Sequence, residues 1–159
     1  MRPYDRIMLP TAFSTLSKRA SANTIPLARQ FGSEVHLVHV VPHTQLVADP
    51  GSGLMGESAA FPIAGPSASE LVERSRRELD AFAGEVLGEI REQVRPFAYV
   101  GGIVEELLRH AQSHSIDLIT MGTHADGMLK RVVFGSIGKS VLEHSPCPVL
   151  LVPVKDAKR

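Results

Sequence analysis

Short apolar runs alternate with longer helical stretches along this chain, and this alternation limits the possible folds more than any other feature of the sequence. The runs are rich in β-branched residues and extend over Arg6 to Leu9, Glu34 to Val41, Arg95 to Val100, Asp117 to Met121 and Pro148 to Val154. Runs such as VHLVHVV are almost continuously apolar, as strands buried on both faces are. Strands that alternate with helices predict right-handed crossovers and a mainly parallel sheet.

The segments between these runs have helical periodicity. Helices are expected over 15–31, 69–92, 104–113 and 135–144. Ser67 and Glu70 are typical of a capping box at the start of the second helix. Pro26 is expected to kink or divide the first helix, because proline has no N–H to donate. The order predicts one α/β domain over 1–159, with a doubly wound, five-stranded, mainly parallel sheet and helices on both faces.

Length, charge and cysteine content narrow the class of protein. A chain of 159 residues suits one domain. Lys plus Arg and Asp plus Glu both number 17, so the basic excess of nucleic-acid or anionic-membrane binders is missing. Cys147 is the single cysteine, and no apolar stretch approaches the roughly 20 residues that span a bilayer. We therefore expect a cytoplasmic protein that binds neither nucleic acid nor membrane.

The segment 43–66 is rich in proline and glycine and has no sustained periodicity. It is longer than connections in compact domains usually are. It follows the second predicted strand, at the end of the sheet where doubly wound proteins bind ligands. Two interpretations stay open, a mobile lid over a site and an uninvolved surface insertion.

The loop after the fourth predicted strand contains the most informative residues. Gly135, Ser136 and Ile137 are placed at the start of a predicted helix, where unpaired N–H groups and the helix dipole favour an anion. Lys130 and Arg131 precede them and are suited to meet phosphate charge. The alternative is structural: Gly135 makes the turn and Ser136 caps the helix.

Gly138-Lys139-Ser140 imitates the end of a P-loop. The P-loop requires an earlier glycine five residues before the Gly-Lys pair, and this chain has Val133 there. Gly138 also falls inside the predicted helix. We therefore interpret Lys139 as a solvated side chain.

The segment from Met121 to Ser140 resembles the nucleotide-binding signature of the universal stress proteins, which reads G-x-x-G, nine residues, then G-[S/T]. Gly122 matches its first position, and Asp126 to Phe134 supply the nine residues before Gly135 and Ser136. The first, second and last predicted strands also resemble those of the family, so the likeness covers nearly the whole chain. It implies the strand order 3-2-1-4-5, ATP binding with Mg²⁺, and homodimers paired through Val149–Val154.

Two departures from the family pattern bear on the ligand. Ala125 replaces the second glycine of the signature, and its Cβ would crowd a phosphate and disfavour a positive φ; Gly127 compensates only in part. Ala12 stands where nucleotide-binding relatives carry an acidic residue near the nucleoside. A lost hydrogen bond there costs about 1 to 3 kcal/mol.

The site that the resemblance and the loop chemistry together predict is a set of small, apolar and basic residues. Its members are Pro10, Thr11, Ala12, Val40, Met121, Gly122, His124, Ala125, Gly127, Lys130, Arg131, Gly135, Ser136 and Ile137. His124 is included because it lies within the loop that begins at Gly122. No catalytic constellation emerges, since His36, His39 and the histidines at helix ends are expected to be structural, and Cys147 to be a small core residue.

Three functions follow from this sequence. The first is a nucleotide-binding regulatory protein that binds Mg-ATP with little turnover and changes a surface for an unknown protein partner. The second is a dimerisation module that has lost its ligand, as Ala12 and Ala125 suggest. The third is an adenine-nucleotide hydrolase, for which no second catalytic motif is found.

Overall fold

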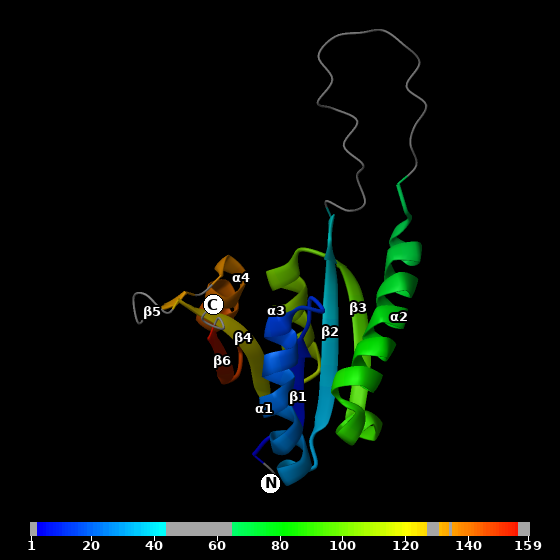
Figure 1. Cartoon of the computed structure of the whole chain (residues 1–159). Coiled ribbons are helices and arrows are strands. Elements are labelled where there is room, and N and C mark those ends of the chain that lie inside the picture. Colours follow the sequence, from blue (N-terminus) through cyan, green and yellow to red (C-terminus); the bar gives the residue numbers. More distant parts are fainter. Residues whose placement is uncertain (1–2, 44–64, 127–130, 134, 156–159) are drawn as a thin grey trace, which may run out of the picture.

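The computed structural model describes residues 3–43, 65–126, 131–133 and 135–155, and it shows a twisted sheet with helices on both faces (Figure 1). The strands are β1 (Arg6–Pro10), β2 (Glu34–Pro42), β3 (Val94–Gly101), β4 (Leu118–Asp126), β5 (Arg131–Val133) and β6 (Val149–Lys155). The helices are α1 (Thr15–Phe31), α2 (Ala68–Val86), α3 (Ile103–Ser113) and α4 (Ser136–His144), with a 3₁₀ segment η2 (Gly88–Gln93) after α2.

The five long strands are parallel and lie in the order β3-β2-β1-β4-β6. This confirms the predicted order 3-2-1-4-5, because β6 is the fifth of the predicted strands. The sequence did not predict β5, a short strand that pairs antiparallel with the far end of β4. Strand order reverses beside β1, so the topological switch point lies between β1 and β4.

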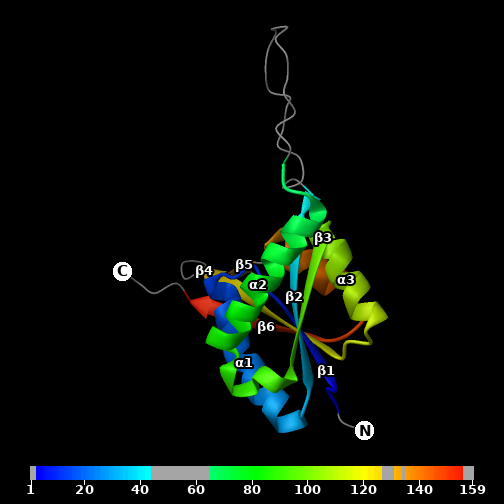
Figure 2. The same cartoon turned by 90° about the vertical axis from the view of Figure 1, so that its right-hand side faces the viewer.

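Alternating side chains of the strands build one apolar layer on each face of the sheet. Leu9, Val35 and Leu37 pack with buried residues of α1 and α2, including Leu79 and Phe82. Met8, Val38, Val40, Leu107 and Val141 belong to the opposite layer, beneath α3 and α4. Figure 2 shows α1 and α2 on one side of the strands and α3 on the other.

Two helix predictions need correction. Pro26 lies inside α1, which continues unbroken to Phe31 and ends at Gly32 in the left-handed conformation (φ 64°). Pro26 cannot donate to the Ala22 carbonyl one turn earlier. Pro26 is exposed, so water can solvate that carbonyl instead. The helix expected over 69–92 ends at Val86, and Gly88 begins the 3₁₀ segment η2. The capping box is confirmed: Glu70 N donates to Ser67 Oγ at 3.2 Å, and Ser67 N donates to Glu70 Oε2 at 2.7 Å.

The loop expected to open at Gly122 starts later than predicted. β4 continues through Gly122 to Asp126, and the chain returns as β5. The pairing of β4 with β6 as far as Ala125 explains this extension, because it satisfies backbone groups that a loop would leave to water. Most of the segment 43–66 lies outside the described residues. Among the described helices, none is long and apolar enough to cross a membrane.

Candidate functional site

A cavity of about 290 Å³ lies at the carboxyl ends of β1, β2 and β4, beside the topological switch point. Doubly wound sheets bind ligands at this position. The described residues around it are Pro10, Thr11, Ala12, Ser14, Leu16, Ser17, Val38, His39, Val40, Ile103, Leu107, Met121, Gly122, Thr123, Gly135, Ile137, Gly138 and Leu151. The cavity therefore combines the ends of three strands with the starts of α1, α3 and α4.

One wall of the cavity is apolar. Val38 and Val40 of β2 are buried, and their side chains pack with Leu107 of α3 in one core cluster. Ile103 and Met121 extend this surface. A surface of branched aliphatic side chains at this position suits a flat, weakly polar group such as a purine base.

The loop between β1 and α1 is held by hydrogen bonds to β2, to the first turn of α1 and within the loop itself. Thr11 N donates to Val38 O at 2.8 Å, which joins the loop to β2. Phe13 N donates to Thr11 Oγ1 at 2.9 Å, and Ala12 N donates to Ser17 Oγ at 3.2 Å. The loop thus presents a fixed backbone to the cavity, although Ala12 supplies no polar side chain.

The side chain of His39 in β2 also holds this loop in place, through contacts with Thr11 and Phe13. The Thr11 carbonyl can only accept, so His39 Nδ1–H donates to it at 2.7 Å. The His39 ring lies against Phe13 with centroids 4.5 Å apart. Phe13 has a φ of 59°, an uncommon conformation for a residue with a Cβ. Such strain persists only where the surroundings enforce it, and here the ring contact and the loop hydrogen bonds do so.

Gly122 serves a packing role that the signature alone did not reveal. A Cβ added to Gly122 would lie 2.3 Å from Leu16 O and 2.8 Å from Leu16 C. The contact is with the backbone of α1, which cannot turn away as a side chain can. Glycine at this position therefore allows α1 to approach β4 where Leu16 and Gly122 both line the cavity.

The start of α4 is open toward the cavity. Gly135 is the N-cap, and among the described residues no side chain caps the helix. This excludes the alternative in which Ser136 caps α4, since Ser136 is its first helical residue. Gly135 and Ser136 are exposed, and a Cβ at Gly135 would meet nothing within 4 Å. Free backbone N–H groups at this end are suited to bind an anion.

Most predicted site residues that the structure describes meet at this cavity. Pro10, Thr11, Ala12, Val40, Met121, Gly122, Gly135 and Ile137 line it, and Ser136 lies between two lining residues. His124, Ala125 and Arg131 lie in the paired ends of β4 and β5. The predictions for Gly127 and Lys130 fall outside the described residues.

Sequence reasoning missed about half of the lining. Ser14, Leu16, Ser17, Val38, His39, Ile103, Leu107, Thr123, Gly138 and Leu151 also line the cavity. Val38 follows from the strand period, because it lies two residues before Val40 on the same face. Ile103, Leu107 and Leu151 carry no comparable signal, since only the packing of α3 and β6 brings them to the site.

The residues expected to be structural behave as predicted in two cases. Lys139 is exposed and pairs with Glu143 at 3.8 Å on the outer surface of α4. Burial raises the pKa of the Cys147 thiol, and Cys147 packs against the core beneath α3 and α4. No cluster of metal-ligating side chains occurs among the described residues.

The strand order and the cavity at the switch point define a Rossmann-like α/β protein. The model of the universal stress protein family matches residues 3–153. A universal stress protein of Methanocaldococcus jannaschii is 28% identical over 94% of this chain and 82% of its own length. The chain belongs to the universal stress protein family, as the sequence resemblance indicated.

Solved structures of the family share this fold. A universal stress protein in complex with cAMP matches with a TM-score of 0.64, at 16% identity over 94% of this chain and 97% of that chain. A universal stress protein of Archaeoglobus fulgidus in complex with dAMP matches with a TM-score of 0.59, at 18% identity over 96% of this chain and 99% of that chain. At these identities the likeness concerns the fold.

Proposed function

We propose that this universal stress protein binds an adenine nucleotide, with ATP as the expected ligand, in the cavity between β1, β2 and β4. The observation that carries the proposal is the pairing of an apolar wall with the uncapped start of α4 across one cavity. The wall suits the base, and the free N–H groups of α4 suit a phosphate. Family members in complex with cAMP and dAMP support this ligand class.

The proposed pose places the base against Val38, Val40 and Leu107. The sugar then lies near Thr11 and Ala12, and the phosphates extend toward Gly135 and Ser136. The described lining contains no carboxylate, so a Mg²⁺ ion would be held by the phosphates and water. Among the described lining residues His39 is the one imidazole; its Nδ1–H donates to the Thr11 carbonyl, and no Ser/His/Asp arrangement surrounds it. These features favour a regulatory protein with little turnover.

Isothermal calorimetry with Mg-ATP at fixed salt tests this proposal. A sample is denatured first, to detect nucleotide carried through purification. Micromolar binding, or a co-purified adenine nucleotide, supports the proposal. No heat up to millimolar ATP in a folded protein contradicts it and favours the ligand-free interaction module.

A pair of matched glycine variants locates the site. Gly135→Asp places a carboxylate at the start of α4, where it occupies the proposed anion site. The affinity of this variant for ATP should fall tenfold or more. Gly84→Asp makes the same change on the exposed surface of α2, where an added Cβ meets nothing within 4 Å. Its affinity should equal that of the unmodified protein. Equal binding by both variants would place the nucleotide elsewhere.

We also propose that the chain forms a homodimer through β6. β6 pairs with β4 on one side, and in the described part of the chain its other edge has no strand beside it. Val149–Val152 are half-buried, which leaves apolar surface on this edge. Proteins rarely leave such an edge unpaired.

Light scattering after size exclusion tests the dimer. Val152→Lys adds a charge to β6 and should yield monomers. Val100→Lys makes the same change at a half-buried valine of β3, the opposite edge of the sheet, and should leave the dimer intact. A monomeric unmodified protein, or a dimer that tolerates Val152→Lys, would rule out this interface.

A further inference from the structure

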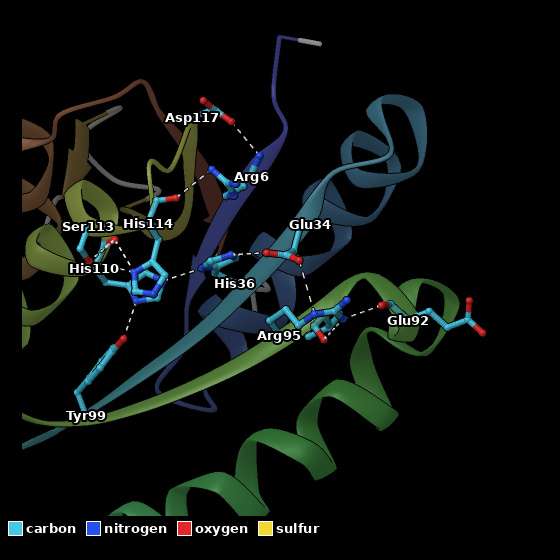
Figure 3. Close-up of polar contacts among 11 residues, drawn as sticks. Arg6, Glu34, His36, Glu92, Arg95, Tyr99, His110, Ser113, His114 and Asp117 are labelled. Atoms are coloured by element: carbon cyan, nitrogen blue, oxygen red, sulfur yellow. Dashed lines mark hydrogen bonds and ion pairs between the residues drawn. The ribbon is translucent and has the colours of Figure 1, made fainter. Parts of the chain in front are cut away.

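A cluster of three histidines lies between the sheet and α3, outside the residues that line the cavity (Figure 3). His36 comes from β2, His110 from the last turn of α3, and His114 is the residue that caps the end of that helix. His36 Nδ1 is 2.8 Å from His110 Nε2, and the rings of His110 and His114 stack with centroids 4.0 Å apart. Phe97 of β3 packs against all three rings.

The hydrogen bonds of this cluster form one chain with a fixed direction. The Glu34 carboxylate can only accept, so His36 Nε2–H donates to it at 2.8 Å. A neutral His36 then accepts at Nδ1, and His110 Nε2–H donates to it. His110 Nδ1 is left as an acceptor for the Tyr99 hydroxyl at 2.7 Å. All four ring nitrogens of His36 and His110 have hydrogen-bond partners when both rings are neutral.

Burial makes an added proton costly. His36 is 3% exposed and His110 is 2% exposed. Desolvation by burial, with smaller contributions from His114 and His36, lowers the pKa of His110 to about 3. Desolvation also lowers the pKa of His36, although Glu34 opposes it. A proton added at His36 Nδ1 would face the N–H at His110 Nε2, so two donors would meet. This conflict is removed only if the His110 proton moves to Nδ1 and the Tyr99 hydroxyl becomes the acceptor.

The charged groups around the cluster come from every element that packs on it. They are Arg6 on β1, Glu34 on β2, Arg95 on β3, Glu106 and Arg109 on α3, and Asp117 before β4. Arg95 pairs with Glu34 at 3.5 Å, and Arg109 pairs with Glu106. Arg6 lies near His36 and lowers its pKa. Glu34 is the group that most favours a charged His36, and Arg95 shares it.

The cluster and the cavity share α3. Leu107 lies one turn before His110 and is 2% exposed, and it packs against Val38 and Val40 of β2. Ile103 and Leu107 both line the cavity. Movement of α3 away from the sheet would therefore free the histidines and remove one wall of the cavity together.

We infer that the histidine cluster is an acid-sensitive latch, which holds α3 against the sheet at neutral pH and releases it, with the cavity wall, in mild acid. His36 and His110 bind protons more readily once α3 leaves the sheet and exposes them, so acid favours the released state. Between pH 7.5 and 5.5 the freed His110 raises the opening equilibrium roughly tenfold, given an ordinary pKa of about 6.5 in the open state. His36 adds to this rise, because its pKa is also lowered in the closed state.

Hydrogen exchange of the α3 peptides at pH 7.5 and 5.5, corrected for the intrinsic pH dependence of exchange, tests the latch. The unmodified protein should open α3 more at pH 5.5, and His110→Gln should lose roughly tenfold of that response. His144→Gln, which removes an exposed histidine from the end of α4, should keep the full response. Equal opening at both pH values, or an unchanged response in His110→Gln, would overturn the inference.

Proton NMR of the unmodified protein provides a check if His110→Gln does not fold. The ring of His110 should stay neutral in the closed state at pH 5.5, and the ring of His36 should titrate below its ordinary pKa. Titration of either ring near pH 6.5 without exchange of α3 would overturn the latch.

The expected effect of α3 opening on ATP affinity rests on the proposed nucleotide site, and it is measured in a separate experiment. ATP affinity measured at both pH values should be weaker at pH 5.5, in step with the opening of α3. Opening of α3 without a change in a measurable ATP affinity would overturn the coupling to the cavity. Absence of ATP binding at either pH contradicts the proposed function, and exchange in α3 then decides the latch alone.

Discussion

Single residues decide how closely the elements around the cavity approach one another. Gly122 permits contact between β4 and the backbone of Leu16, and His39 ties the β1–α1 loop to β2. Ala12 lines the cavity without contributing a polar group to it. Substitutions of a few atoms at Gly122 and Ala12 should therefore change the free energy of unfolding and the nucleotide affinity, respectively.

Gly122→Ala should destabilise the fold. Its Cβ would lie 2.3 Å from Leu16 O, so α1 or β4 must shift. We expect a loss of about 1 to 3 kcal/mol in the free energy of unfolding, measured by urea denaturation. Gly84→Ala, in the interior of α2 with open space around its Cβ, should gain about 0.5 to 1 kcal/mol. Equal effects at both positions would contradict the packing role of Gly122.

Ala12→Asp should strengthen nucleotide binding. The exposed Ala12 lines the cavity, and an aspartate there would supply the acidic group that the family resemblance implies at this position. A recovered hydrogen bond worth about 1 to 3 kcal/mol predicts a Kd roughly 5-fold to 150-fold lower in calorimetry. Ala125→Gly, by comparison, should leave affinity unchanged, because Ala125 lies in the paired part of β4, where alanine is tolerated. A larger gain from Ala125→Gly than from Ala12→Asp would reverse this ranking.

At the scale of elements, the packing of helices against the sheet overrides local preferences. α1 keeps Pro26 in its interior because Ala20, Thr24 and Ala28 are buried against the sheet on both sides of it. Thr24 Oγ1 is 2.7 Å from Thr120 Oγ1 of β4, which adds a buried link between helix and strand. The helix is thus held along its length by tertiary contacts, as most protein helices are.

Pro26→Ala should stabilise α1. Alanine supplies the N–H that the helix lacks at this position and removes the clash of the ring, while the unfolded chain gains freedom. The balance predicts a gain of about 1 to 2 kcal/mol. Thermal and urea unfolding followed by circular dichroism would show it as a higher midpoint. A lower midpoint would mean that α1 depends on the bend that proline favours.

At the scale of the whole molecule, the buried histidines make stability depend on pH. His36 and His110 have a lowered pKa in the folded state, so the unfolded chain binds more protons below about pH 6.5. Their contribution is complete above that pH and is lost as the pH falls toward the folded values.

The free energy of unfolding should therefore fall between pH 7.5 and 5.5. His110 alone predicts a loss of about 1.4 kcal/mol over this range, and His36 adds to it. Urea denaturation at the two pH values measures the loss, and His110→Gln should reduce it. Constant stability across this range would contradict the neutral, buried state of both histidines.

Much of the fold was predictable, because it depends on local patterns of residues. The apolar runs predicted all five parallel strands, and Ser67 with Glu70 predicted the start of α2. The exceptions arise where long-range pairing decides: β4 extends past Gly122 because β6 pairs with it, and β5 forms against that extension. The end of α2 at Val86 likewise had no strong local signal.

The sequence by itself determined the family, the strand order implied by that family, and the small residues that the start of α4 and the β1–α1 loop require. These follow from the spacing and size of residues, which are written directly in the chain. Only the tertiary structure decided that Ile103, Leu107 and Leu151 complete the cavity, that Gly122 is needed for packing, and that His36, His110 and Tyr99 form one hydrogen-bonded chain. Such contacts join residues far apart in sequence, and their geometry exists only once the elements have packed together.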